Sequence, residues 1–182
     1  MSAKTRTTAV VLIPPHEVWE PIQAIRRKHD PQVRRWMPHV TLLYPFRPRE
    51  EFNRVAEPLR AAASVFHSFE VCLREFRAFR CASGRATLYL APEPSGAITA
   101  LQSALQKVVP DCNDVRLYPT GFTPHLSIGR AENREAADRL LRSLQTTWQP
   151  VQFVADRVSL IARDEPPNDV FEVILELPLG NG

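Results

Sequence analysis

PHVTL at residues 38–42 recurs later in the chain as PHLSI at residues 124–128. Each copy runs proline, histidine, apolar residue, hydroxyl residue, apolar residue. A proline biases the residue before it toward extended geometry, and the alternation that follows is typical of a half-buried strand. Residues i and i+2 of a strand share a face. Each copy therefore predicts a strand with an imidazole beside a hydroxyl: His39 with Thr41, and His125 with Ser127.

The hydrophobic pattern outside these motifs predicts alternating strands and helices. Strands are predicted over residues 8–13, 69–79, 86–91, 151–162 and 170–177. A helix with Val18, Ile22 and Ile25 on one face should end in the cations of residues 26–28. Further helices are predicted over 49–66, from an N-cap at Ser95 to Pro110, and after an N-cap at Asn133. Pro58 lies inside the second helix and predicts a kink or a break there.

The order of these elements nearly repeats, with one motif strand in each half. This arrangement predicts an α+β fold of two similar lobes, each an antiparallel sheet with helices packed outside. The two sheets should line a central groove, with His39 and His125 facing each other across it. No long linker or low-complexity segment interrupts the pattern, so residues 1–182 are expected to form a single domain.

Composition limits the class of protein. The chain of 182 residues has 44% hydrophobic and 24% charged residues, as expected of a globular domain with a real core. A net charge of +3 permits an anionic partner without requiring one. Three cysteines without a CxxC pair argue against a disulfide scaffold and a structural zinc site. The apolar run at 9–13 is too short for a signal or membrane segment, so a cytoplasmic location is expected.

Two histidines across a groove can supply a general base and a general acid together, because imidazole titrates near neutral pH. The two hydroxyls could bind the oxygens of a phosphate placed between them. A cyclic phosphodiester fits this arrangement, and hydroxyls, imidazolium and arginine could stabilise its charge without a metal. Other interpretations remain: each histidine could bond only a backbone group, and two histidines alone make a poor metal site.

Four further residues have open roles. Arg130 either binds phosphate or is solvated; in a regular strand it shares the face of Ile128, which a bulge at Gly129 would change. Tyr44 and Phe122 could stack on a base, although core packing is the alternative for each. Tyr118, which also precedes the second motif, is considered on the same terms.

The longer strings HVTLLYPF and TPHLSIGR resemble the paired H-x-T/S-x motifs of the 2H phosphoesterase superfamily, and most closely its LigT-like branch of RNA 2′,3′-cyclic phosphodiesterases and 2′-5′ RNA ligases. The resemblance implies a bilobal α+β fold, a monomer without cofactor, metal-independent catalysis, and an RNA or nucleotide 2′,3′-cyclic phosphate as substrate. It also implies that His39 and His125 are catalytic and that Thr41 and Ser127 bind phosphate. Ser127 departs from the commoner threonine and loses the restricted β-branched rotamer, which predicts reduced activity. The alternative is a non-catalytic RNA- or nucleotide-binding module that uses the same groove.

Overall fold

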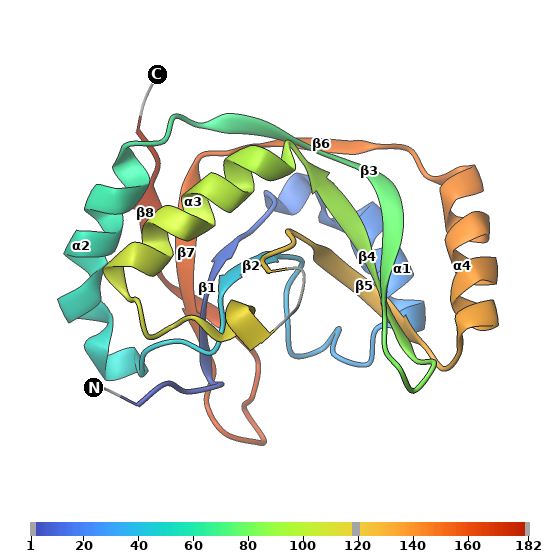
Figure 1. Ribbon diagram of the computed structural model, residues 1–182, viewed down its shortest axis with the longest axis horizontal. Coiled ribbons are helices and arrows are strands. Elements are labelled where there is room, and N and C mark those ends of the chain that lie inside the picture. The colour runs from blue at the N-terminus through green and yellow to red at the C-terminus, as the bar shows by residue number, and fades with distance from the viewer. Residues whose placement is uncertain (1–2, 118–120, 181–182) are drawn as a thin grey trace.

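Two four-stranded antiparallel sheets form the framework of the protein, for which a computed structural model describes residues 3–117 and 121–180 (Figure 1). The first sheet has the order β2 (Val40–Leu43), β1 (Thr8–Leu12), β7 (Arg157–Ala162), β8 (Glu172–Pro178). The second has the order β5 (Leu126–Ala131), β4 (Ala86–Glu93), β3 (Phe69–Arg80), β6 (Val151–Ala155). In both sheets the strand that carries a motif lies at one edge, which confirms the predicted bilobal α+β architecture.

Four α-helices cover the outer faces of the sheets (Figure 1). Helix α2 (Phe52–Ser64) packs against the first sheet, and α1 (Trp19–His29) and α4 (Arg134–Thr147) pack against the second. Helix α3 (Ser95–Val108) packs on α2 and contacts β2 of the first sheet and β4 of the second. Each helix buries an apolar stripe at helical spacing, as α2 does with Phe52, Val55, Leu59 and Ala63. Because α1 follows β1 of the first sheet but contacts β5 of the second, it ties the two lobes together.

The prediction of one strand over residues 151–162 is wrong, because the segment divides between the two sheets. β6 is an edge strand of the second sheet, and after the single residue Asp156 the chain continues as β7 inside the first sheet. Burial alternates along β6 but is continuous from Val158 to Ala162 in β7. Continuous burial of this kind is typical of a strand covered on both faces. The first lobe is therefore completed by the C-terminal strands.

Three local predictions can be compared with the structure. Helix α2 continues through Pro58 without a break, and its predicted first turn is a separate 3-10 turn at Arg49–Glu51. Asn133 caps α4 as predicted, since its side chain accepts a hydrogen bond from the Ala136 N–H at 2.8 Å. Ser95 is the first residue of α3 rather than its N-cap, and the Glu93 carboxylate accepts its N–H at 2.8 Å.

The main core runs continuously between sheets and helices through both lobes. A second, smaller cluster lies on the opposite face of the first sheet, where Ala9, Val11, Ile161 and Phe171 pack against Trp36. This cluster supports the side of the sheet that carries the first motif. Among the described residues, no helix is long and apolar enough to cross a membrane.

Candidate active site

The two motif strands meet where the sheets adjoin. β2 and β5 are edge strands of different sheets and contact each other. His39 and His125 each stand one residue before their strand begins, at Val40 and Leu126. The histidines are close enough for the charge of His125 to lower the pKa of His39. The structure thus brings the two predicted imidazoles together from residues 86 positions apart in the sequence.

Both motif strands carry a bulge at the same place, directly after the hydroxyl residue. Thr41 pairs with Val11 and Leu43 with Val10, which leaves Leu42 as the extra residue. Ser127 pairs with Tyr89 and Gly129 with Leu88, which leaves Ile128 as the extra residue. A bulge of this kind shifts the alternation of side chains by one position. The two lobes therefore share an irregularity as well as a sequence motif.

The bulge in β5 changes which face Arg130 occupies. Arg130 pairs with Thr87, and Ser127 pairs with Tyr89 two residues further along β4. Because residues directly opposite each other share a face of the sheet, Arg130 lies on the same face as Ser127. The face expected for a regular strand is thus wrong, and the alternative of a bulge near Gly129 is correct. The Arg130 side chain is exposed.

The two imidazoles are held in the same way. Nδ1 of His39 lies 2.7 Å from the carbonyl oxygen of Met37, and Nδ1 of His125 lies 2.8 Å from that of Thr123. A carbonyl oxygen can only accept, so Nδ1 must carry the proton in both rings. In the neutral ring, Nε2 then has a free lone pair and can take a proton. Each motif therefore presents one preoriented base, or one acid when the ring is charged.

Both histidines are half-buried, and burial lowers the pKa of each. The pKa of His39 falls to about 4, chiefly through desolvation and to a smaller extent through the positive charge of Arg26. Desolvation also lowers the pKa of His125. Both rings are therefore neutral at pH 7 when the groove holds no anion. A negatively charged phosphate placed between them would raise the pKa values again.

Aromatic rings fix the two imidazoles from different directions. The His39 ring stacks on Trp36 at a centroid distance of 4.6 Å, and Trp36 in turn stacks on Phe171 at 3.8 Å. The His125 ring meets Phe79 at 4.9 Å and Tyr89 at 5.7 Å, in both cases in a T-shaped arrangement. The two histidines therefore occupy matched positions in unlike surroundings.

The loop that carries Trp36 is held by a long-range ion pair. Asp169, whose side chain is 2% exposed, accepts hydrogen bonds from Arg34 at 2.5 Å and from Arg35 at 2.8 Å. The Phe171 N–H also donates to the carbonyl of Arg35 at 2.9 Å. These contacts keep the Trp36 ring between Phe171 and His39. Sequence reasoning missed Asp169, because nothing near it in the chain marks a partner 134 residues away.

A second ion pair lies behind His39. Arg26 of α1 is 2% exposed and donates to Asp30 at 3.0 Å through Nε and to Gln23 at 3.0 Å. Asp30 also accepts the Gln32 N–H at 2.8 Å, so the pair fixes the end of α1 and the start of the loop. The sequence predicts Arg26 only as a cation at the end of a helix, where it favours the helix dipole; its burial is a tertiary effect.

The remaining predicted site residues lie around the histidines. Thr41 and Ser127 are half-buried, one residue into their strands. Tyr44 is 37% exposed, and its ring meets the edge of Trp36 at 5.5 Å. Phe122 is half-buried three residues before His125. Tyr118 lies outside the described residues.

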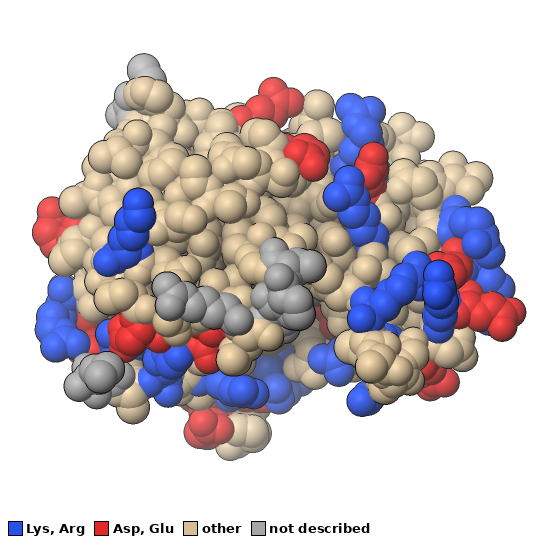
Figure 2. All heavy atoms as spheres, viewed as in Figure 1, with Lys and Arg blue, Asp and Glu red and all other residues tan. Residues whose placement is uncertain are grey.

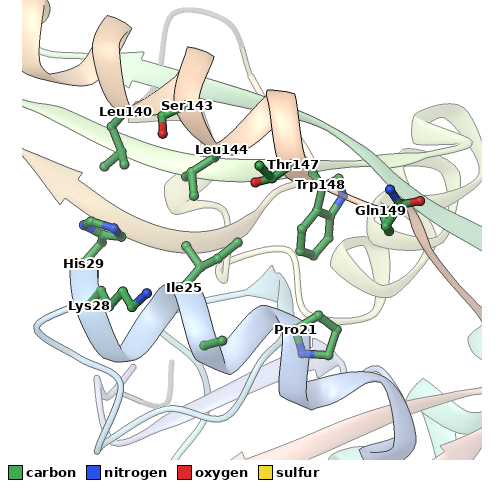
Figure 3. Close-up of a pocket in the computed structure, with 11 residues that line it drawn as sticks. Pro21, Ile25, Lys28, His29, Leu140, Ser143, Leu144, Thr147, Trp148 and Gln149 are labelled. Atoms are coloured by element: carbon green, nitrogen blue, oxygen red, sulfur yellow. The ribbon is translucent and has the colours of Figure 1, made fainter.

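A hollow of about 460 Å³ between α1 and α4 is a different feature (Figure 3). Its walls carry Ile25, His29, Leu144 and Trp148, and none of the predicted site residues lines it. On the face shown in Figure 2, basic and acidic side chains are interspersed. Within the described residues, no three His, Cys, Asp or Glu side chains converge as metal ligands do. The two motifs therefore define the candidate site.

The fold and the paired histidine motifs together define a bilobal protein of the two-histidine phosphoesterase type. The model of the 2′-5′ RNA ligase superfamily matches residues 14–167. The chain therefore belongs to that superfamily. Membership of this superfamily supports a function like that of 2H phosphoesterases or 2′-5′ RNA ligases.

Relatives agree with this assignment. The chain is 26% identical over 175 residues to a protein of Bacillus cytotoxicus named "Putative phosphoesterase Bcer98_0945", covering 95% of this chain and 96% of that protein. It is 24% identical over 153 residues to "Putative phosphoesterase OB1230" of Oceanobacillus iheyensis, covering 84% and 86%.

Solved structures share the fold. TT0787 of Thermus thermophilus superimposes with a TM-score of 0.64 at 19% identity, covering 96% of this chain and 98% of that chain. Escherichia coli LigT complexed with 3′-AMP superimposes with a TM-score of 0.56 at 17% identity, covering 97% and 99%.

Proposed function

We propose that this protein hydrolyses 2′,3′-cyclic phosphate ends of RNA or nucleotides without a metal, using His39 and His125 as an acid–base pair. Thr41 and Ser127 would hydrogen-bond the non-bridging phosphate oxygens, and Arg130 would add positive charge at the rim. With a ribose 5′-hydroxyl in place of water as the nucleophile, the same site would open the 2′,3′-cyclic end by breaking the bond from phosphorus to the 3′ oxygen and so form a 2′-5′ linkage. The LigT structure with 3′-AMP adds support from a fold relative that holds a nucleotide.

The proposed reaction balances without a cofactor. Nε2 of the neutral histidine takes a proton from water as the water oxygen attacks phosphorus. The bond from phosphorus to one ribose oxygen breaks, and that oxygen receives a proton from Nε2 of the second, charged histidine. The product is a nucleoside 2′- or 3′-monophosphate. The two rings have then exchanged protonation states, and proton exchange with solvent restores them.

One observation carries the proposal: both histidines bond a carbonyl through Nδ1, at 2.7 and 2.8 Å, and so keep Nε2 available for proton transfer. A module that only binds phosphate needs hydrogen-bond donors, but it needs neither a base nor two rings that both keep Nε2 free. The experiment is to incubate the protein with a nucleoside 2′,3′-cyclic phosphate, with and without a chelator, and to separate the 2′ from the 3′ product. Turnover that disappears with the chelator would refute the metal-independent mechanism.

The pH dependence of kcat/KM should have an acidic optimum. Catalysis requires one neutral and one charged histidine, and burial lowers both pKa values from 6.5, that of His39 to about 4. Above pH 6.5 both rings of the free enzyme are neutral, so kcat/KM should fall as pH rises, because the acid is missing. The profile is measured from pH 4 to 9, and an optimum above pH 7.5 would contradict this expectation.

Folding must be followed in the same pH series. The pKa of His39 is lower in the folded chain than in the unfolded chain, so the unfolded chain binds more protons between pH 6.5 and 4. Stability contributed by the neutral ring is present above pH 6.5 and is lost as pH falls toward 4. Circular dichroism at each pH separates this loss from the titration of the catalytic groups.

Removing the motif hydroxyls should weaken the reaction without changing its pH profile. Thr41→Val and Ser127→Ala each delete a donor to a charged phosphate oxygen, and such a bond contributes about 1.5–3 kcal/mol. Each variant should therefore lose roughly tenfold to a hundredfold in kcat/KM. Ser103→Ala, which removes a hydroxyl from the exposed surface of α3, serves as the control. Unchanged kcat/KM in both motif variants would show that these hydroxyls do not bind the phosphate.

A further inference from the structure

A recess of about 230 Å³ opens beside His125. Thr123 and Pro124, the two residues before His125, form one wall, and Tyr89 and Phe122 contribute aromatic rings. Tyr89 also pairs with Ser127 across the strands and lies 5.7 Å from the His125 ring. Tyr89 therefore links the recess to the proposed catalytic groups.

Polar groups also line the recess. Arg77 comes from β3, Glu93 from the end of β4, and Ser95 and Thr99 from the first turns of α3. One Glu93 oxygen accepts the Ser95 N–H at 2.8 Å, which orients the carboxylate. An ionised carboxylate has about four acceptor positions, so Glu93 can still receive N–H groups from a ligand. The recess thus combines aromatic faces with an oriented acceptor.

The charges make a second phosphate an unsuitable occupant. Arg77 is the cation of the recess, and its guanidinium already donates to Glu75 at 2.8 Å. Glu93 adds a second carboxylate nearby. Two carboxylates beside one guanidinium repel an anion, whereas a neutral, planar group with N–H donors would meet an acceptor and two ring faces.

We infer that this recess binds the nucleobase of the nucleotide that carries the reacting phosphate, and that Glu93 selects bases by their N–H donors. The inference rests on the proposed function for the location of the phosphate. Phe122 then supplies a stacking surface, as one of the two interpretations of its sequence position predicts. Stacking tolerates every base, because each has a π face, so the selectivity belongs to Glu93.

The four bases differ in what they offer to a carboxylate. Guanine presents N1–H and its 2-amino group side by side, which matches the two oxygens of Glu93. Adenine and cytosine each present one amino group beside an acceptor nitrogen. Uracil presents one N–H between two carbonyl oxygens, which a carboxylate repels. The expected order of preference is therefore guanine first and uracil last.

The test compares kcat/KM for guanosine and uridine 2′,3′-cyclic phosphates. A bidentate contact to a base discriminates against bases that cannot make it, so guanosine should be favoured by roughly tenfold. Glu93→Gln keeps an oxygen that can accept the Ser95 N–H, so the variant should fold, but it removes the charge and one acceptor. The ratio should then fall to about two or below, because the bidentate contact is gone. Glu57→Gln, on the exposed surface of α2, is the matched control.

Binding of 3′-GMP and 3′-UMP, measured by calorimetry on the same proteins, tests the recess independently of turnover. A guanine preference that Glu93→Gln abolishes supports the inference. Equal affinity for the two nucleotides, or a preference that survives Glu93→Gln, overturns it. If neither cyclic nucleotide is hydrolysed but 3′-GMP is preferred, the base recess stands and the proposed hydrolytic function fails. If both cyclic nucleotides are hydrolysed without a base preference, the proposed hydrolytic function stands and the base recess fails.

Discussion

His39→Ala and His125→Ala should each reduce kcat on a 2′,3′-cyclic phosphate by about a thousandfold, within the range of 10²–10⁴ that general acid–base catalysis contributes. Each substitution removes one Nε2 that the Nδ1–carbonyl bonds aim for proton transfer. The double variant should be only slightly slower than either single variant, because an acid and a base that act in one step do not contribute independently. Each single variant should also lose one limb of the pH profile.

The affinity for a nucleotide distinguishes a loss of catalysis from a general loss of structure. In His39→Ala and His125→Ala, calorimetric affinity for 3′-AMP should stay within about tenfold of the unmodified chain, because the hydroxyls and the rim remain. His67→Ala, at an exposed position away from the site, is the matched control. Full turnover in either motif variant would contradict the acid–base role. A parallel loss of turnover and binding would favour the non-catalytic module instead.

The motif residues could be predicted from the sequence because their signal is local. Proline before a histidine, followed by alternation, specifies an extended segment and the shared face of His39 and Thr41 within five residues. Two copies of that segment predicted the two lobes. The bulge after Thr41 was not predicted, and the bulge after Ser127 was only one of two alternatives. A bulge is a relation between two strands, and the partners Val11 and Tyr89 are fixed only by the fold.

Long-range contacts explain the other differences between the structure predicted from the sequence and the one observed. Asp156 separates two strand-forming segments, and nothing in its neighbours indicates that the chain changes sheets there. Asp169 holds Arg34 and Arg35 across more than 130 residues, and the burial of Arg26 depends on where α1 docks. Each of these features depends on tertiary contacts, which local sequence propensity does not determine. The contacts of Asp169 and of Arg26 also support His39, so the supporting structure was harder to predict than the site itself.

Gly129 is the position where α1 meets the motif strand β5, and substituting it should have the largest structural effect. A Cβ at this position would lie 2.6 Å from the Cβ of His29 and 2.8 Å from the His29 carbonyl oxygen. A backbone oxygen cannot rotate away, so α1 must move off β5. Gly129→Ala should therefore lower the free energy of unfolding by about 1–3 kcal/mol, the usual cost of overpacking.

The same substitution should also reduce activity, because α1 carries the Arg26–Asp30 pair behind His39 while β5 carries Ser127 and follows His125. Separating α1 from β5 moves one histidine relative to the other, and a misplacement of about 1 Å can cost a hundredfold in rate. Denaturant unfolding and kcat/KM measure the two effects.

Gly96→Ala is the matched control: its Cβ would meet no atom within 4 Å, and it lies in the first turn of α3. Alanine there should be neutral or stabilising by up to about 1 kcal/mol. Equal stability of the two variants would show that α1 can yield at Gly129, and that the close approach of helix and strand does not set the spacing of the histidines.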